Sequence, residues 1–353
     1  MARTYSSAMF IPANARPCGA RCFQAVKRLF FLGAVALYGS DALPAQSTSV
    51  ERATVIVVVG APGEEEYGRN FAEWAGALSK AAAKAGAKDV VIGLQTNNAT
   101  ADREQLQQTL AAEPKNGSAE LWLVLIGHGT SDGKEAKFNL RSNDVAATEL
   151  ANWLQPFRRP LAIINAASAS SPFLQKLSGT NRVVITATRS GSEVNYARFG
   201  QYFSGAVADL EADLDKDGQT SLLEAFLMAS RRVKEFYDLE GRLATEHALL
   251  DDNGDGFGTP PAWFRGVRAV KSAKDGAALD GFRAHQFHLV RSEAERRLPP
   301  ETRARRDALE FSLSKLRETK RALPEEVYYE KLESLLLELA RLYEQAEQAP
   351  KGN

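Results

Sequence analysis

Two side chains able to do chemistry follow two apolar segments of the sequence. His128 stands between two glycines after the apolar run at 121–126, and Ser168 lies among small residues after the apolar run at 161–165. Continuous runs of this kind are typical of buried strands in a parallel sheet, and such sheets carry their sites at the carboxyl ends of the strands. Because an imidazole can act as a base and a hydroxyl as a nucleophile, the pair predicts a catalytic site at that edge.

The elements that would position this pair alternate between strand and helix. An apolar, β-branched run at 53–60 is followed by helical spacing of apolar residues at 65–85, and the alternation continues as far as residue 188. This order favours an α/β fold with helices on both faces of a mainly parallel sheet, which makes three layers. We expect five core strands, which end near Val59, Leu94, Ile126, Asn165 and Thr188.

A change in composition marks the C-terminal part of the chain. From residue 291 the sequence is rich in Glu, Arg, Leu and Ala, and two apolar stripes at helical spacing are joined by a short turn. This pattern predicts an α-helical hairpin, similar to a coiled coil, that would mediate self-association or docking. The stripes consist of Leu309, Leu313 and Leu316 on the first helix, and Leu332, Leu335, Leu339 and Leu342 on the second.

An acidic loop between two predicted helices, at 196–210 and 221–237, has the spacing of an EF-hand calcium loop. Its carboxylates stand at loop positions 1, 3, 5 and 12, and a glycine at position 6 allows the sharp turn. Carboxylate and carbonyl oxygens are the ligands that calcium prefers, so the loop predicts a calcium site. The ligands would be the side chains of Asp213, Asp215, Asp217 and Glu224, and the backbone carbonyl of Gln219.

A second acidic stretch repeats the first half of this pattern. Asp251, Asn253 and Asp255 occupy positions 1, 3 and 5, but position 12 falls on Ala262, whose side chain has no ligand atom. Two interpretations stay open. The loop either binds calcium with a ligand borrowed from elsewhere in the chain, or it is a solvated turn.

Residues 1–46 have the three-part pattern of a secretory signal peptide, with basic residues, a short apolar run at 29–39 and small residues near a cleavage point. We expect an exported protein, periplasmic or secreted, with no membrane span after removal of the signal; an uncleaved anchor is the alternative. Cys18 and Cys22 both lie in this segment, so the mature chain has no thiol to act as a nucleophile.

The 44 basic and 44 acidic residues balance, which gives no sign of a nucleic-acid partner.

The two chemical segments together resemble the caspase-haemoglobinase family, most of all its legumain-type and bacterial caspase-like cysteine peptidases. His128 and Gly129 match the HG motif that follows a strand in this family, and residues 168–171, Ser-Ala-Ser-Ser, stand where C-x-S-G is expected. The resemblance covers residues 54–237. It implies a caspase-like domain over 50–290, with the hairpin at 291–353 as an extension. It also implies that His128 activates the nucleophile and that the amide of Gly129 helps to hold the oxyanion.

The second motif departs from the family, because one alignment puts Ser168 and another puts Ala167 where the cysteine is expected. A hydroxyl is a far weaker nucleophile than a partly ionised thiol near neutral pH, and a serine enzyme needs an acid that orients its histidine. Asp132 and Glu193 are the candidates for that acid, because they lie near the motifs. We therefore expect a calcium-binding pseudo-peptidase that binds a protein or peptide, with a hydrolase that uses Ser168 and His128 as the alternative.

Overall fold

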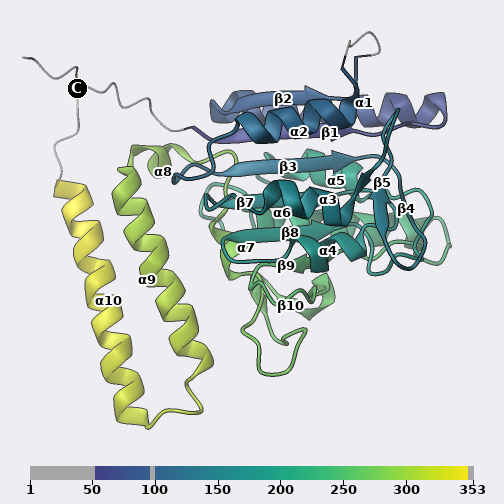
Figure 1. Cartoon of the computed structure of the whole chain (residues 1–353). Helices are drawn as coiled ribbons and strands as arrows, with labels where there is room; N and C mark the ends of the chain where they lie inside the picture. Colours follow the sequence, from purple (N-terminus) through teal and green to yellow (C-terminus); the bar gives the residue numbers. More distant parts are fainter. Residues whose placement is uncertain (1–51, 96–99, 349–353) are drawn as a thin grey trace, which may run out of the picture. The chain divides into compact units, whose positions relative to one another are not determined.

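The apolar segments of the sequence form a central six-stranded sheet (Figure 1). In the computed structural model, which describes residues 52–95 and 100–348, the strand order is β2-β1-β3-β7-β8-β9. The first five strands run parallel, and β9 runs antiparallel to β8. The predicted signal segment at 1–46 lies outside the described residues. The strands span β1 Thr54–Val59, β2 Lys88–Ile92, β3 Leu121–Ile126, β7 Leu161–Asn165, β8 Arg182–Thr186 and β9 Leu249–Asp251.

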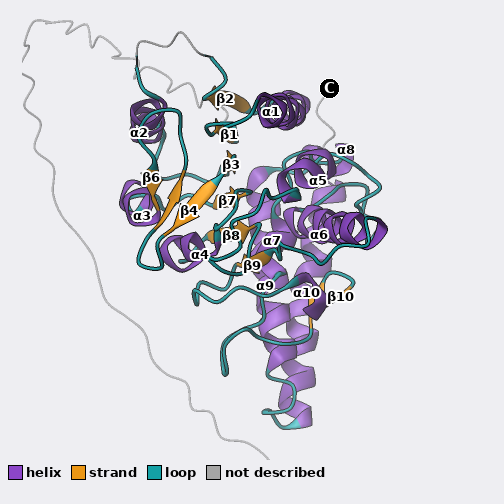
Figure 2. Cartoon of the chain, turned by 90° about the vertical axis from the view of Figure 1, so that its right-hand side faces the viewer, coloured by secondary structure: helices purple, strands orange, loops and turns teal. Residues whose placement is uncertain are grey.

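Helices cover both faces of this sheet. Figure 2 shows α1, α5 and α6 on one side and α2, α3 and α4 on the other. Because side chains alternate along a strand, Val57 of β1 joins the core under the first group and its neighbour Val58 joins the core under the second. The predicted three-layer α/β class is confirmed. The helices span α1 Glu65–Ala85, α2 Asp102–Ala112, α3 Ala147–Leu154, α4 Ser171–Leu177, α5 Phe199–Ala206 and α6 Leu222–Leu239.

A small antiparallel sheet follows β3 and precedes α3. It consists of β4 Gly129–Ser131, β5 Ala136–Phe138 and β6 Val145–Ala146. The side chain of Phe138 is fully buried and packs in the core under α2, α3 and α4. Because β4 begins at Gly129, the backbone immediately after His128 is held by strand pairing and does not form a free loop.

Helix α5 is shorter than the sequence pattern predicts. The expected helix at 196–210 begins at Phe199 and ends at Ala206, and Leu210 is 57% exposed. Beyond the helix, a carboxylate oxygen of Asp209 accepts a hydrogen bond from the backbone N–H of Glu211, and this local turn replaces further helix. The acidic loop is therefore separated from α5 by a turn, whereas α6 begins within the last positions of the loop.

The C-terminal segment forms the predicted helical hairpin, in which α9 and α10 contact each other. Leu309 and Leu316 of α9 and Tyr328 of α10 are buried. The guanidinium of Arg306 in α9 donates to both carboxylate oxygens of Glu295, at 2.6 and 2.7 Å. No described helix is both long and apolar enough to cross a membrane. The remaining elements are η1 Pro261–Trp263, β10 Phe264–Arg265, β11 Arg268–Ala269, α7 Phe282–Gln286, α8 Glu293–Arg297, α9 Pro300–Glu318 and α10 Glu325–Gln348.

Candidate functional site

Strands β3 and β7 bring the two predicted catalytic segments to one edge of the sheet. They are parallel neighbours, with Leu125 opposite Asn165. The chain beyond β3 carries His128 and Gly129, and the chain beyond β7 carries Ser168. The side chain of Ser168 consequently lies against the backbone of Gly129, as two parallel strands that end together require.

The hydroxyl of Ser168 both accepts a hydrogen bond from the backbone of Gly129 and donates one to it. Its Oγ accepts a hydrogen bond from the Gly129 N–H at 3.1 Å and donates one to the Gly129 carbonyl oxygen at 3.1 Å. Ser168 is 2% exposed. A β-carbon placed on Gly129 would lie 2.4 Å from the carbonyl oxygen of Ser168, so only glycine permits this approach. The amide that the family resemblance assigns to the oxyanion is therefore occupied by the serine itself.

The ring of His128 lies among aromatic side chains. Its centroid is 5.3 Å from that of Tyr67, 5.4 Å from that of Phe71 and 6.0 Å from that of Tyr196. The ring Nε2 is 3.1 Å from the carbonyl oxygen of Pro62. Because a carbonyl only accepts, Nε2 carries the proton in this contact. Within the described part of the chain, no hydrogen bond joins this ring to Ser168.

Neither acid suggested by the sequence lies behind His128. Asp132 occupies the turn between β4 and β5, where hydrogen bonds from the N–H groups of Glu135 and Lys134 lower its pKa. Glu193 instead accepts a hydrogen bond from the Nδ1 of His247 at 2.6 Å. The sequence offered no sign of this second pair, because its members lie far apart along the chain and no local motif contains both.

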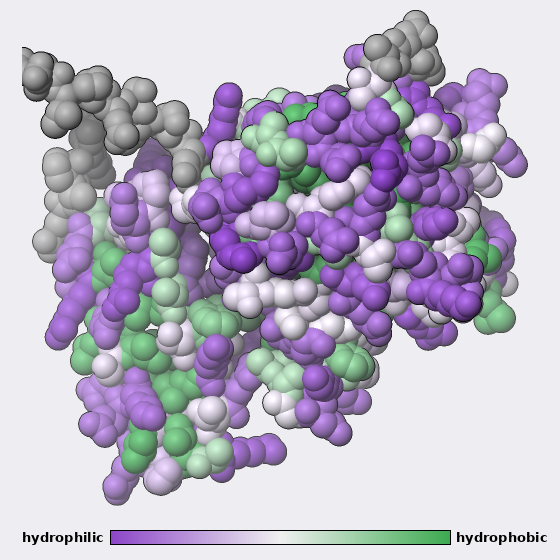
Figure 3. Space-filling model, viewed as in Figure 1, coloured by the Kyte–Doolittle hydropathy of each residue, from purple (hydrophilic) through white to green (hydrophobic). Residues whose placement is uncertain are grey.

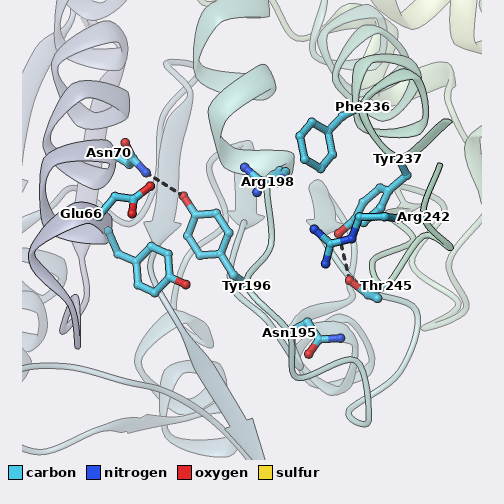
Figure 4. A pocket seen from close by; sticks show the side chains of 10 residues that line it. Glu66, Asn70, Asn195, Tyr196, Arg198, Phe236, Tyr237, Arg242 and Thr245 are labelled. Carbon is cyan, nitrogen blue, oxygen red and sulfur yellow. Dashed lines mark hydrogen bonds between the residues drawn. The ribbon is translucent and has the colours of Figure 1, made fainter. Parts of the chain in front are cut away.

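A polar pocket of about 370 Å³ opens beside the aromatic surroundings of His128 (Figure 4). Tyr67 and Tyr196 line it and stack with ring centroids 4.4 Å apart. The guanidinium of Arg198 lies 4.0 Å above the ring of Phe236, and Arg242 also faces the pocket. Neither arginine has an ion pair among the described residues. The pocket thus combines aromatic surface with two cations that can bind an anionic group.

The carboxylates of the acidic loop converge. Oxygen atoms of Asp213, Asp215 and Asp217 lie within 4.8 Å of one another. The Asp213 carboxylate accepts hydrogen bonds from the N–H groups of Lys216 at 2.6 Å and Gly218 at 3.1 Å, which wrap the backbone around it. Gly218 has a φ of +87°, a conformation that favours glycine. Hard oxygen donors grouped at this spacing fit a calcium ion.

Glu224, the predicted ligand at position 12, both caps α6 and faces the loop. Its Oε1 accepts a hydrogen bond from the N–H of Leu214 at 2.7 Å. Its Oε2 accepts one from the N–H of Ser221 at 2.8 Å, and Ser221 in turn caps the Glu224 N–H. Ligand atoms of Glu224, Asp215 and His285 lie within 4.8 Å of one another. His285, on α7, was not indicated by any pattern in the sequence.

The second acidic loop repeats the internal hydrogen bonds of the first. Asp251 accepts hydrogen bonds from the N–H groups of Gly254 and Gly256, at 3.0 and 3.1 Å, and the side-chain oxygen of Asn253 accepts one from Asp255 at 2.8 Å. Burial raises the pKa of Asp251. Both interpretations of this loop stay open, calcium binding with a borrowed ligand and a solvated turn, because its twelfth position is Ala262.

Comparisons with known proteins give remote likenesses only. No family model and no curated protein matches the sequence. The fold is similar to the Drosophila initiator caspase Dronc, at 13% identity over 57% of this chain and 79% of that chain, with a TM-score of 0.36. It is similar to caspase-1 from Spodoptera frugiperda, at 11% identity over 57% and 86%, with a TM-score of 0.37.

A third similar structure is a protein of Geobacter sulfurreducens, at 11% identity over 52% of this chain and 89% of that chain, with a TM-score of 0.36. Likenesses this remote carry no activity to the chain. The α/β fold is established by the strand order and strand directions described above.

Proposed function

We propose that this chain is an exported, calcium-binding protein of caspase-like fold that binds a protein or peptide and does not cleave it. The observation that carries the proposal is the pairing of Ser168 with the backbone of Gly129. A serine nucleophile needs a hydroxyl that a neighbouring base can deprotonate and a free oxyanion donor beside it. Here the hydroxyl of Ser168 is buried and donates its proton to the carbonyl oxygen of Gly129. The N–H of Gly129, which would be the oxyanion donor, already donates to the Oγ of Ser168.

The polar pocket supports the binding part of this proposal. Tyr196 receives a hydrogen bond from the side chain of Asn70 at 3.4 Å, and burial raises the pKa of its phenol. Aromatic faces with unpaired guanidinium groups from Arg198 and Arg242 are suited to a peptide that carries a carboxylate.

The helical hairpin supports a second contact, either with another copy of this chain or with another protein. Figure 3 shows apolar side chains among charged ones along it. Apolar residues on α10 that are more than a third exposed are Val327, Tyr329, Leu336, Leu337 and Tyr343. Exposed apolar groups gathered on one helix are typical of interaction surfaces.

A labelling experiment separates the binding protein from a serine hydrolase. The full chain, Ser168→Ala and the surface control Ser192→Ala are incubated with a fluorophosphonate probe and with peptidyl probes of serine hydrolases. We expect the same background labelling in all three, because the Ser168 hydroxyl has no base to activate it. Labelling of the wild type and of Ser192→Ala that disappears in Ser168→Ala would overturn the proposal in favour of a hydrolase that uses Ser168 and His128.

A further inference from the structure

A second cavity, of about 850 Å³, lies between α6 and the chain on either side of β9. We call it the apolar pocket. Its walls are formed by Phe199, Leu227, Val233, Ala248, Pro261 and Trp263. None of the residues that line it lines the polar pocket. Its volume falls within the range of cavities that bind small organic ligands, and its walls are apolar as such cavities usually are.

Arg189 and His247 both line the apolar pocket and are held by one carboxylate. Glu193 Oε1 contacts the Nδ1 of His247 at 2.6 Å and the Nε of Arg189 at 3.3 Å. Glu193 Oε2 accepts hydrogen bonds from the backbone N–H groups of the same two residues, at 3.2 and 2.9 Å. Glu193 does not line the pocket, whereas Arg189 and His247 do. The carboxylate therefore orients both side chains from behind.

The orientation leaves the guanidinium of Arg189 for a ligand. The Nδ1 of His247 is bonded to Glu193, and its Nε2 has no protein partner among the described residues. The side chain of Arg189 is 62% exposed, and its ion pair among the described residues is the contact of its Nε with Glu193. A carboxylate at the terminal nitrogens of Arg189 would receive charge-assisted hydrogen bonds.

The acids among the lining residues already have partners. Both oxygens of Glu246 accept hydrogen bonds from the backbone N–H groups of Arg198 and Phe199 or from the hydroxyl of Tyr237. Asp238 pairs with Lys234 on the surface of α6. These acids are thus engaged with the protein, whereas the terminal nitrogens of Arg189 can still donate to a ligand.

We propose that the apolar pocket binds a monocarboxylate with an apolar body, such as a medium-chain fatty acid. The hydrocarbon chain lies along Phe199, Leu227 and Trp263, and the carboxylate lies against the terminal nitrogens of Arg189. This inference concerns a site that shares no lining residue with the polar pocket or the first acidic loop, so it does not depend on the function proposed above.

The test is calorimetric titration of the full chain with octanoate, decanoate and decanol. We expect decanoate to bind at least about tenfold more tightly than decanol, because only the carboxylate can pair with the charged guanidinium of Arg189. Each added methylene from octanoate to decanoate should improve affinity about threefold to fourfold. Trp263 lines the pocket, so its fluorescence change on binding gives an independent signal.

Variants assign the binding to this pocket. Arg189→Gln should weaken decanoate at least fivefold and leave decanol unchanged, and Leu227→Trp should narrow the cavity and weaken binding of both. Lys80→Gln, which removes an exposed cation on α1, should bind as the wild type does. A melting curve of each variant confirms that it is folded.

Three results would overturn the proposal. They are no heat from decanoate at millimolar concentration, equal affinity for decanoate and decanol, or unchanged binding in a folded Leu227→Trp variant.

Discussion

At the scale of single residues, the hydrogen-bond partner decides what a side chain can do. Ser168 and His128 are the residue types of a hydrolase, yet the serine hydroxyl is bonded to Gly129 and the imidazole Nε2 faces the carbonyl of Pro62. His247 differs from His128, because its Nδ1 is bonded to the carboxylate of Glu193, which fixes the orientation of the ring. His247, which belongs to no catalytic motif in the sequence, thus has the better oriented imidazole ring.

The burial of His288 predicts that the free energy of unfolding depends on pH. Burial lowers its pKa to about 4, whereas a histidine in an unfolded chain titrates near 6.5. Between these values the unfolded state binds the additional proton. The free energy of unfolding contributed by this group is therefore fully present above pH ~6.5 and falls by about 3 kcal/mol as the pH drops through 4.

Urea unfolding at pH 7 and pH 4.5, in the presence of chelator, measures this contribution. His288→Gln should lose less stability between the two pH values than the wild type, by about 2–3 kcal/mol. The control Lys80→Gln, an exposed substitution on α1, should lose as much stability as the wild type does. An equal loss in His288→Gln and the wild type would show that the group does not act in this way.

At the scale of elements, the connection from β3 into β4 fixes the geometry of the candidate site. The pairing of β4 with β5 sets Gly129 opposite Phe138, and this places the Gly129 backbone against the turn after β7. That turn is itself unusual, because Ala169 has a φ of +50° in a position where glycine is favoured. The chain after β3 and the turn after β7 therefore fix each other's position.

Replacing Gly129 with alanine should disrupt this contact. The added β-carbon would meet the carbonyl oxygens of Ser168 and Lys137, at 2.4 and 3.1 Å, and backbone atoms cannot rotate away. We expect a loss of about 1–3 kcal/mol in the free energy of unfolding, measured by denaturant titration. The control Gly76→Ala, on α1 with no atom within 4 Å of its β-carbon, should be neutral or up to about 1 kcal/mol more stable. Equal stability of the two variants would refute the steric argument.

The sequence predicts the elements better than it predicts their contacts. The five parallel strands end within two residues of their expected positions, because long apolar runs leave little choice of structure. The end of α5 is missed, because the turn formed by Asp209 overrides the apolar spacing that continues to Leu210. The partners of Ser168 and Glu193 cannot be predicted, because each is brought close only by tertiary packing.

At the scale of the whole molecule, the first acidic loop joins segments that are distant in the sequence. His285 on α7 contacts the carboxylate of Asp215 at 3.0 Å. The side-chain oxygen of Gln219 accepts a hydrogen bond from the N–H of Ser292, which caps α8, at 3.0 Å. An ion bound at this loop would therefore stabilise the chain around α6, α7 and α8 together, and its effect would extend to global stability.

Thermal unfolding with millimolar calcium or with chelator, compared between the wild type and Glu224→Gln, tests the central claim most directly. Glutamine keeps the helix cap of α6 but lacks the charge that calcium needs at position 12. At about 100 times the dissociation constant, calcium should add about 2.7 kcal/mol to the wild type and raise its melting temperature by about 5 °C. The control Glu73→Gln, an exposed residue of α1, should show the same rise, and Glu224→Gln should show almost none. An unchanged wild-type melting temperature, or an equal rise in Glu224→Gln, would contradict a calcium-stabilised protein.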